Sequence, residues 1–546
     1  MKQRKNRDCW GAAGLMVLAV VAALPGCSSL RDQPVTGDGG GPADGGDGGA
    51  RDGILVDADG PDGAAGLRPR GAACDSPAVC ASGFCSTDGV CCDRACTDPC
   101  EACNVAGSTG TCALVASGQP RGKPACPGSG PCQGACTGAS AACTFPGGTT
   151  ACGANTCAST TLTPAGACNG AGACQPGPTV ECAPYLCAVD RCLTSCEKNE
   201  DCATNHFCDT SSKTCVSRAV EIGVGSAHTC ALLADGTVWC WGANGEKQLG
   251  VDVGTTASKP VELPALKGRL KAFGGGGSGY TCAITTDNKV LCWGTSVLGT
   301  DTLTTSRFDA KPVQTVSRVD LDNVRALATA YEFACALRDD GVWCWGAGGA
   351  GELGTGNTDS SAVAVRTLAQ TNITRIDVGI GAGSAIRRST GEIFVWGLSF
   401  LGDGLGGSTP VTIQDAGVER LGIGDRIWCL LTPASAMRCY ASGPNPGYRN
   451  WPQVLGNVSL MAVGTSTVCA AQDGGAVSCG RPGAAFVEQS GIRNPVRLAS
   501  ESYASHFCAI AQDGRVICWG NNSSGQLGIG SSGGGPDKPP TQVTWK

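Results

Sequence analysis

Residues 225–250 read GSAHTCALLADGTVWCWGANGEKQLG, and this stretch decides the fold. Its first half holds a short apolar run, Cys-Ala-Leu, and its second half holds Val-Trp-Cys-Trp, which favours a strand. The pair Asp235-Gly236 between them is a turn signal, so the stretch predicts a β-hairpin. A three-residue loop with Gly236 in the left-handed region would place Cys230 opposite Cys240. Opposed strand residues lie about 4.5–5.5 Å apart at Cα, which is within reach of a disulfide.

The same pattern returns along the last 329 residues and is clearest again at 506–528, HFCAIAQDGRVICWGNNSSGQLG. Seven copies can be counted, and their anchor residues are Cys230, Cys282, Cys335, Ala385, Cys429, Cys469 and Cys508. Separations of about 39 to 53 residues, filled by short strands, are typical of propeller blades. The 84 Gly residues also disfavour a mostly helical protein. We therefore expect an all-β, seven-bladed β-propeller over residues 218–546.

Paired cysteines recur in six of the seven copies. The fourth copy lacks both members at once, with Ala385 and Val395 in their places, and no copy keeps only one. Independent thiols would more readily be lost singly, so the pairs predict disulfides within blades, with buried free cysteines as the alternative. The six predicted pairs are Cys230–Cys240, Cys282–Cys292, Cys335–Cys344, Cys429–Cys439, Cys469–Cys479 and Cys508–Cys518.

The repeated elements Gly-x-x-His-x-Cys-Ala-Leu, Asp-Gly, Val-x-x-Trp-Gly-x-Asn and Gly-Gln-Leu-Gly together resemble the repeat of the regulator of chromosome condensation family. The resemblance implies a seven-bladed propeller, with tail residues 541–544 as the last outer strand, matching 259–262. It weakens where Tyr440 and Gly480 replace the Trp after the second Cys. The best-known member is a nucleotide-exchange factor that uses a wedge in one blade, and no residue here matches that wedge. Another secreted relative caps a β-lactamase, which implies a binding surface here.

The N-terminus has the features of an export signal. Four basic residues precede an apolar run at 11–24, which is too short to span a bilayer comfortably. Leu24-Pro25-Gly26-Cys27 follows and resembles the bacterial lipobox, so residues 1–26 would be removed and Cys27 would carry lipid, including palmitate. Ser28 favours the outer membrane over the inner one. A plain signal peptide with an incidental Cys is the alternative. The Gly-, Asp- and Pro-rich segment 27–70 is expected to be a disordered tether.

Residues 71–217 are expected to form a loop-dominated region held by disulfides. The stretch 74–215 contains 24 of the 38 cysteines and few aliphatic residues, so cross-links must replace an ordinary core. Cys100 and Cys103 form a CxxC pair that would suit zinc, but no second such pair lies at finger spacing. Cys196, Cys202, Cys208 and Cys215 look like one small knot, while the connectivity of the whole region stays open.

Composition and motifs offer little for catalysis. The formal charge of −6 gives no electrostatic footprint for nucleic acid, and the chain has three His residues. No GxSxG, HExxH or GxxxxGK[ST] motif occurs. His228 and His506 share one repeat position with apolar residues of other copies, which indicates a packing position. We expect no catalytic, cofactor-binding or metal-binding residue.

Binding is expected on the loops that differ most between copies, at 250–260, 298–312 and 354–372. A further candidate is the loop bearing Tyr448, Arg449 and Trp451, since these residue types dominate binding hot spots. In the alternative reading, Trp451 fills the place of the missing core Trp. The resulting hypothesis is a monomeric outer-membrane lipoprotein, facing the periplasm or the cell surface, whose propeller binds a protein or glycan. The rivals are an exported hydrolase or lyase acting on envelope polysaccharide and a purely structural envelope component.

Overall fold

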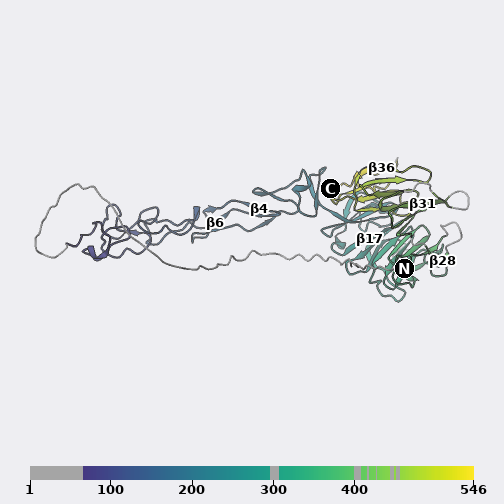
Figure 1. Cartoon of the computed structure of the whole chain (residues 1–546), viewed down its shortest axis with the longest axis horizontal. Coiled ribbons are helices and arrows are strands. Elements are labelled where there is room, and N and C mark those ends of the chain that lie inside the picture. The colour runs from purple at the N-terminus through teal and green to yellow at the C-terminus, as the bar shows by residue number, and fades with distance from the viewer. Residues whose placement is uncertain are drawn as a thin grey trace, which may run out of the picture. The chain divides into compact units, whose positions relative to one another are not determined.

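The computed structural model describes residues 66–295, 307–398, 407–414, 417–425, 427–442, 448–450, 455–535 and 537–545 (Figure 1). Regular structure in these ranges consists of β-strands and four single-turn 3₁₀ helices: η1 (Pro77–Val79), η2 (Gly130–Cys132), η3 (Asn199–Asp201) and η4 (Pro264–Leu266). Within the same ranges, no helix is long and apolar enough to cross a membrane. Cys27 and the segment 27–65 lie outside the described residues.

The cysteine-rich region is built from very short strands joined by disulfides. Its strands are β1 (Glu101–Ala102), β2 (Ala113–Leu114), β3 (Ala151–Cys152), β4 (Thr156–Ala158), β5 (Thr161–Thr163), β6 (Gly166–Cys168), β7 (Cys174–Gln175), β8 (Val180–Glu181), β9 (Cys187–Ala188), β10 (Arg191–Cys192), β11 (His206–Asp209) and β12 (Thr214–Ser217). Regular pairing begins before residue 70, because Arg68 already forms a bridge with Cys80. The buried clusters consist mostly of cysteine, so sulfur replaces the missing aliphatic core.

All 24 cysteines of this region form disulfides, in three groups that span 74–91, 92–192 and 196–215. The four cysteines between 196 and 215 pair first with third and second with fourth, as a small knot. The first four, between 74 and 91, pair in the same way. Cys100–Cys136 and Cys132–Cys168 overlap, each joining residues 36 apart. Disulfides therefore tie the middle segment, 92–192, into one linked series, while 74–91 and 196–215 are each cross-linked within themselves.

The rest of the chain forms seven four-stranded antiparallel sheets, each made of four consecutive strands. Blade 1 has β13 (Ala219–Val224), β14 (His228–Leu233), β15 (Val238–Ala243) and β16 (Thr256–Glu262); blade 2 has β17 (Leu270–Gly276), β18 (Tyr280–Thr285), β19 (Val290–Gly294) and β20 (Arg307–Pro312); blade 3 has β21 (Ala326–Thr329), β22 (Phe333–Arg338), β23 (Gly341–Gly346) and β24 (Ser361–Leu368). Blade 4 has β25 (Arg375–Gly379), β26 (Ala382–Arg387), β27 (Glu392–Gly397) and β28 (Gly407–Gln414); blade 5 has β29 (Arg420–Ile423), β30 (Ile427–Leu431), β31 (Met437–Ser442) and β32 (Tyr448–Asn450). Blade 6 has β33 (Val458–Val463), β34 (Val468–Gln472), β35 (Ala476–Gly480) and β36 (Val487–Arg493); blade 7 has β37 (Arg497–Ala499), β38 (His506–Ile510), β39 (Val516–Gly520) and β40 (Lys538–Gln542). The predicted all-β, seven-bladed architecture is confirmed.

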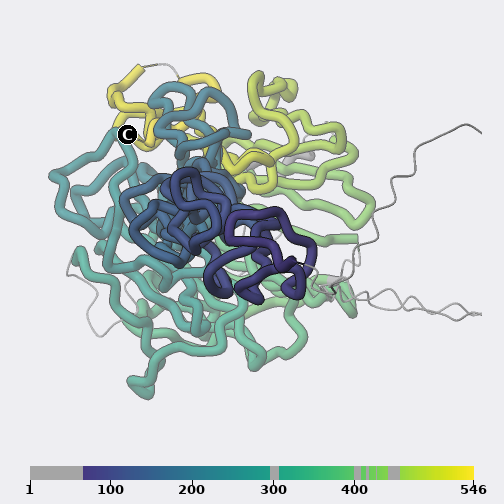
Figure 2. The backbone as a smooth tube through the Cα atoms, turned by 90° about the vertical axis from the view of Figure 1, so that its left-hand side faces the viewer, coloured from purple at the N-terminus to yellow at the C-terminus, as the bar shows by residue number. Residues whose placement is uncertain are grey.

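The seven sheets close into a ring. The first strand of each blade contacts the first strand of the next, from β13 round to β37, and β37 and β38 contact β13. Figure 2 shows these blades following one another from teal to yellow, with the C-terminal end beside the first blade. Because no blade borrows a strand from another, the ring is held shut by side-chain and backbone contacts between blades 1 and 7.

The central hairpin has the predicted register in the six blades that carry a cysteine pair. Cys230 lies opposite Cys240, and Gly236 in the intervening loop has φ +80°. Asn288 takes the equivalent place in blade 2 with φ +65°, a conformation that Asn tolerates. All six cysteine pairs lie directly opposite on β-strands and form disulfides with Cα–Cα distances of 4.1–4.2 Å. The sulfur bridge therefore links two neighbouring strands in six blades.

Blade 4 differs from the prediction by one residue. Ser384, not Ala385, lies opposite Val395, while Ala385 lies opposite Phe394. Four residues separate the last opposed pair, Arg387 and Glu392, so this turn is longer than that of blade 1. The longer turn moves the repeat position one residue toward the N-terminus. A buried Ser384 thus occupies the place of the first Cys.

The last outer strand is also displaced from its expected position. Strand β40 was expected at 541–544, matching 259–262, but it spans Lys538–Gln542. Thr541 lies opposite Cys518 as Val261 lies opposite Cys240, so the correct alignment is shifted by two residues. The shift leaves three further described residues, Val543 to Trp545, for contacts beyond the strand.

Candidate functional site

The junctions between blades share one recurring arrangement, here called the Trp seat. A Trp after the second repeat position donates its indole N–H to a backbone carbonyl of the loop from the preceding blade. Trp241 bonds to Gln526 at 2.8 Å, Trp293 to Gln248 at 2.9 Å, and Trp396 to Glu352 at 2.7 Å. The residue after each carbonyl is a fully buried leucine: Leu527, Leu249 and Leu353. The Gln-Leu-Gly element of the repeat therefore fills the junction with the neighbouring blade, by accepting the Trp N–H and burying its leucine there. We call this element the plug.

The two propeller histidines belong to the same junctions. His506 Nε2 lies 2.9 Å from Thr229 Oγ1, which itself donates to the Gln526 carbonyl. Because that threonine proton is already used, the imidazole donates to the threonine. His228 makes the equivalent bond to Thr281 at 2.8 Å. The repeat position of His228 and His506 is a packing position, as expected. It also carries a hydrogen bond between blades, which could not be inferred from the sequence because other copies have apolar residues there.

Burial keeps both imidazoles neutral. Desolvation lowers the pKa of His228 to about 4. Desolvation and the nearby His228 lower the pKa of His506 to about 3. Neither ring is exposed to solvent, so neither can exchange protons with a substrate. The third histidine, His206, is in the cysteine-rich region and bonds through Nδ1 to the Thr204 carbonyl.

Replacing His506 with Phe is expected to reduce the acid sensitivity of the fold. The folded-state pKa lies below the ordinary 6.5, so the unfolded chain binds a proton that the folded chain does not, and stability falls as pH drops from 6.5 toward 3. Between pH 7 and pH 4 wild type should lose about 3 kcal/mol relative to His506→Phe. Phe333 fills the same position in blade 3, so the slot accepts the ring. Urea unfolding at both pH values checks this, and parallel losses in the two proteins would contradict it.

The two carboxyl groups with raised pKa change stability with pH in the opposite direction to the histidines. They do not affect the comparison of wild type with His506→Phe, because both proteins contain them. Desolvation raises the pKa of Glu501 to about 7 and that of Asp377 to about 6. A raised carboxyl pKa gives stability that is lost as pH rises, and both groups are present in wild type and variant alike. Glu501 accepts hydrogen bonds from Ser226 and Ser502 beside a Tyr331–Tyr503 ring pair, 4.6 Å between centroids. These contacts join blades 1, 3 and 7.

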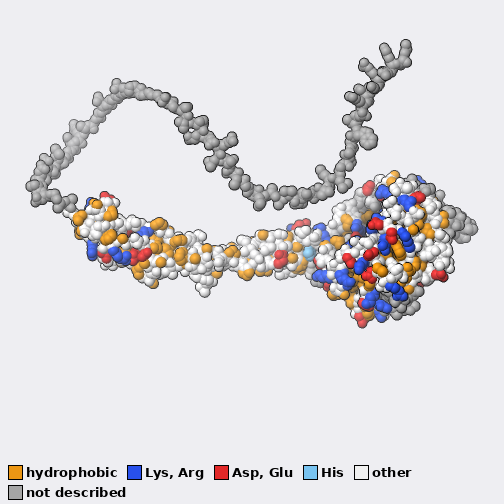
Figure 3. All heavy atoms as spheres, turned by 90° about the horizontal axis from the view of Figure 1, so that it is seen from below, with side chains coloured by type: hydrophobic (Ala, Val, Ile, Leu, Met, Phe, Trp, Pro, Cys, Tyr) orange, Lys and Arg blue, Asp and Glu red, His pale blue; other side chains and the backbone are white. Residues whose placement is uncertain are grey.

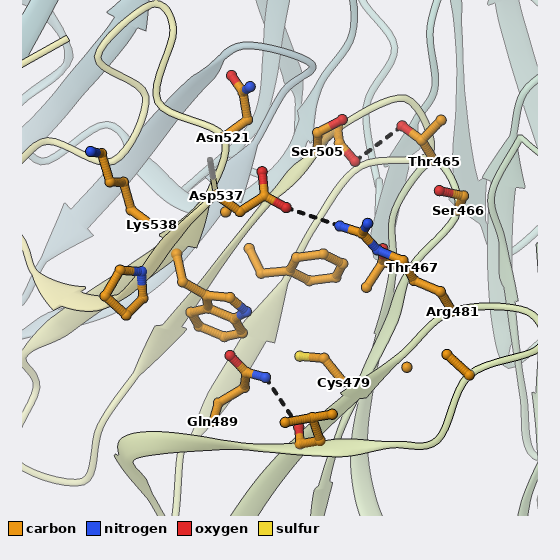
Figure 4. Close-up of a pocket in the computed structure, with 18 of the residues that line it drawn as sticks. Thr465, Ser466, Thr467, Cys479, Arg481, Gln489, Ser505, Asn521, Asp537 and Lys538 are labelled. Carbon is orange, nitrogen blue, oxygen red and sulfur yellow. Dashed lines mark hydrogen bonds and ion pairs between the residues drawn. The ribbon is translucent and has the colours of Figure 1, made fainter. Parts of the chain in front are cut away.

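A cavity of about 710 Å³ opens between blades 6 and 7 (Figure 4). Phe507 and Trp519 stack at its wall, with ring centroids 5.8 Å apart. Polar groups line the rest, including Arg481, which bonds to Asp537 at 2.9 Å and to Thr467 Oγ1 at 3.0 Å. Figure 4 shows Asn521, Gln489, Lys538 and the hydroxyl groups of 465–467 around the same space. The cavity therefore combines an apolar wall with planar hydrogen-bonding groups.

The predicted binding residues are only partly described. Tyr448 and Arg449 lie on β32, where they pair with Ser442 and Ala441, and Trp451 lies outside the described residues. Tyr440, which replaces the usual Trp, stacks on Trp428 with centroids 4.1 Å apart. The predicted variable ranges are partly strands: 250–260 includes the start of β16, and 354–372 contains all of β24. Of the range 298–312, residues 307–312 form β20, and 298–306 lies outside the described residues.

The cysteine clusters that could hold a metal are composed of disulfide partners. The fullest one, Cys92, Cys96, Cys103 and Cys112, brings four sulfurs together, but its members are joined as Cys92–Cys103 and Cys96–Cys112. Disulfide sulfur is a poor ligand beside thiolate, so these clusters would bind zinc only after reduction. Cys100 of the CxxC pair is joined to Cys136.

Surface charge on the propeller is mixed. On the face shown in Figure 3, basic and acidic side chains are interspersed. Ion pairs of the propeller include Arg338–Asp322 and Arg497–Glu221. A surface of mixed sign does not build the single-sign field that steers nucleic acid.

Comparison with known proteins shows what the propeller is similar to. Family models described as the regulator of chromosome condensation (RCC1) repeat match residues 219–248, 235–284 and 501–526. The ultraviolet-B receptor UVR8 of Arabidopsis thaliana is 25% identical over 58% of this chain and 68% of its own length. The human E3 ubiquitin-protein ligase HERC2 is 24% identical over 33% of this chain but only 4% of its own length.

Similar solved structures include yeast RCC1 (Prp20) bound to Kap60, with 19% identity, a TM-score of 0.39, and coverage of 59% of this chain and 74% of that one. The ectodomain of the Arabidopsis thaliana receptor kinase ACR4 has 14% identity and a TM-score of 0.37, covering 61% of this chain and all of that one.

Proposed function

We propose that this chain, which carries regulator of chromosome condensation repeats in its propeller, is an exported lipoprotein that displays the propeller as a binding scaffold for a protein or glycan partner. The observation that carries the proposal is the open cavity between blades 6 and 7, in a ring whose blades 1, 2 and 4 have their Trp bonded to the preceding loop and six of whose blades carry a disulfide. A rigid ring with a preformed cavity is suited to recognition, because little conformational entropy is lost in ordering it on binding.

The chemistry of the propeller favours binding over catalysis. Both propeller histidines are buried and bonded between blades. The carboxyl groups with raised pKa, the buried Glu501 and the half-buried Asp377, lie on different blades and do not form an acid–base pair. The one carboxylate lining the cavity, Asp537, is paired with Arg481. General acid–base catalysis needs a group that reaches substrate and can exchange its proton, and these groups do not meet that condition.

Export and outer-membrane anchoring rest on the N-terminal signal and the disulfides. Disulfides are kept in oxidising compartments, and the cysteine-rich region depends on them for its core. A lipidated Cys27 at the start of the mature chain would hold the protein at a membrane, since acyl chains contribute about 0.8 kcal/mol per buried CH₂.

Replacing Cys27 with Ser tests anchoring and binding together. The variant should move from the membrane fraction to the soluble exported fraction, because the acyl chains that hold it are gone. The released full chain then serves as bait in cross-linked envelope extract, where a specific protein or glycan should be recovered. Cys9→Ser, within the signal segment, is the matched control and should leave fractionation unchanged. Membrane retention of the Cys27 variant would contradict the lipoprotein proposal, and an empty bait would favour a structural component.

A further inference from the structure

The junction between blades 6 and 7 retains its Trp but lacks the loop that would seat it. In blades 1, 3 and 7 the third and fourth strands are joined by residues 244–255, 347–360 and 521–537, and each loop seats the Trp of the next blade. In blade 6 the connection is only 481–486, Arg-Pro-Gly-Ala-Ala-Phe, with no Gln-Leu-Gly. Trp519 of blade 7 therefore faces a seat with no plug.

The indole N–H of Trp519 has no hydrogen-bond partner among the described residues, although the side chain is only 5% exposed. Phe507 stands where blade 1 has Thr229, because each lies opposite the Trp of its blade. The phenyl ring takes up part of the space, but a cavity of about 710 Å³ remains beside it. Because Trp519 lines the cavity, a hydrogen-bond acceptor that enters the cavity can reach this N–H.

The junction between blades 5 and 6 has no Trp seat. Blade 6 itself has Gly480 in place of Trp, and a side chain there would meet the Phe486 ring at 3.0 Å. In that blade both the Trp and the space for it are gone. At the junction with blade 7, by contrast, the Trp is kept beside an open cavity, the loop that would fill the cavity is missing, and Phe507 replaces the threonine.

We propose that this empty seat binds a β-turn of a partner protein, which presents a backbone carbonyl to Trp519 Nε1 and a leucine-sized side chain to the cavity. The proposal rests on the binding function proposed above and names the class of ligand. The template for the ligand is the chain's own Gln526-Leu527-Gly528, which fills the seat of Trp241. Arg481, Gln489 and Asn521 on the cavity wall supply hydrogen-bonding groups for the backbone of the turn.

Two other occupants fit less well. A saccharide would stack on an open ring face, but Phe507 and Trp519 are 4% and 5% exposed and offer no such face. A second copy of this chain would have to withdraw its own loop 521–528, which already bonds to Trp241 and Thr229. A partner with a protruding turn needs neither change.

The test is titration of a labelled cyclic peptide with the sequence Asn-Asn-Ser-Ser-Gly-Gln-Leu-Gly, copied from 521–528, into the full mature chain. Fluorescence polarisation should give a dissociation constant on the order of 100 µM, as expected for a small turn that loses freedom on binding. Exchanging the peptide leucine for alanine should weaken binding roughly tenfold. Trp519→Phe, which removes the N–H together with part of the indole ring, should weaken it roughly fivefold or more, because a hydrogen bond and some packing are both lost.

Ala485→Trp should abolish binding by filling the cavity, since Ala485 is exposed at its edge and the fold tolerates a larger side chain there. Ala265→Trp, at an exposed site in η4 between blades 1 and 2, is the matched control and should bind the peptide as wild type does. Failure of the peptide to bind at millimolar concentration, equal binding by Ala485→Trp, or binding of an oligosaccharide in its place would each overturn the proposal. If the envelope bait still captures a partner after Ala485→Trp, the scaffold function stands and this site is wrong.

Discussion

Replacing Trp545 with Ala is expected to lower the free energy of unfolding of the propeller by about 3–5 kcal/mol, the range for a large buried aromatic. The side chain is 3% exposed and lies edge-on to two rings of blade 1, 6.0 Å from each centroid: those of Trp239 and Trp241. The residue before it, Thr544, bonds to the Gly528 carbonyl at 2.9 Å. Residues 543–545 are here called the C-terminal clasp. Since no strand is exchanged between blades 1 and 7, the packing of this clasp against blade 1 supplies a large part of the energy that holds the ring closed.

Trp545→Phe is the matched control. Its indole N–H is buried without a partner among the described residues, so replacing it with an aromatic ring of similar shape removes packing but no hydrogen bond. The expected cost is below about 2 kcal/mol. Chemical denaturation of the full chain, followed by tryptophan fluorescence, measures both variants. Equal stability of Trp545→Ala and wild type would show that the clasp does not close the ring.

Reduction under otherwise native conditions is expected to unfold residues 67–217 while leaving the propeller folded. Each native bridge in a small cross-linked region contributes about 3 kcal/mol, and this region has twelve bridges and little apolar core. The propeller has buried apolar clusters in every blade, and its bridges are almost wholly inaccessible. Limited proteolysis should therefore cut first within 67–217 after reduction and leave a stable fragment that begins near residue 218.

The propeller itself supplies the control for this expectation. Blade 4 is folded with Ser384 opposite Val395 and no bridge. The double variant Cys508→Ser with Cys518→Val copies that pair into blade 7 and should remain folded, with a loss of about 2–3 kcal/mol. If protease cuts the reduced protein within the propeller before it cuts within 67–217, then the expectation that only 67–217 depends on its disulfides for folding is wrong.

Local signals in the sequence were enough to predict the blades. The Asp-Gly turn and the apolar periodicity of 225–250 predict strand register, and the structure places Cys230 opposite Cys240 as that register requires. The predicted register was wrong where the length of a turn or loop could not be read from the sequence. In blade 4 one extra turn residue moved the repeat position from Ala385 to Ser384. In blade 7 the position of β40 depends on pairing with β39, which the spacing of Thr541 and Val543 alone could not fix.

Features that depend on contacts between blades were out of reach. The position of His506 looked apolar because Tyr280 and Phe333 share it, and its bond to Thr229 crosses from the last blade to the first. The connectivity of the cysteine-rich region could not be derived either, because many pairings satisfy the same spacing. The empty Trp seat did leave a signal. A short 481–486 connection before a retained Trp519 can be read from the sequence once the role of Gln-Leu-Gly is known.

We propose that the cysteines form disulfides after export, and that these disulfides stabilise a seven-bladed propeller that binds a partner. The most direct test is peptide mapping of the chain isolated from a cell envelope, alkylated and digested without reduction. The account predicts that Cys230 and Cys240 are recovered as one cross-linked species, likewise Cys508 and Cys518, and that no cysteine between 74 and 518 is alkylated. Alkylated cysteines at these positions, in protein that was never reduced, would contradict it.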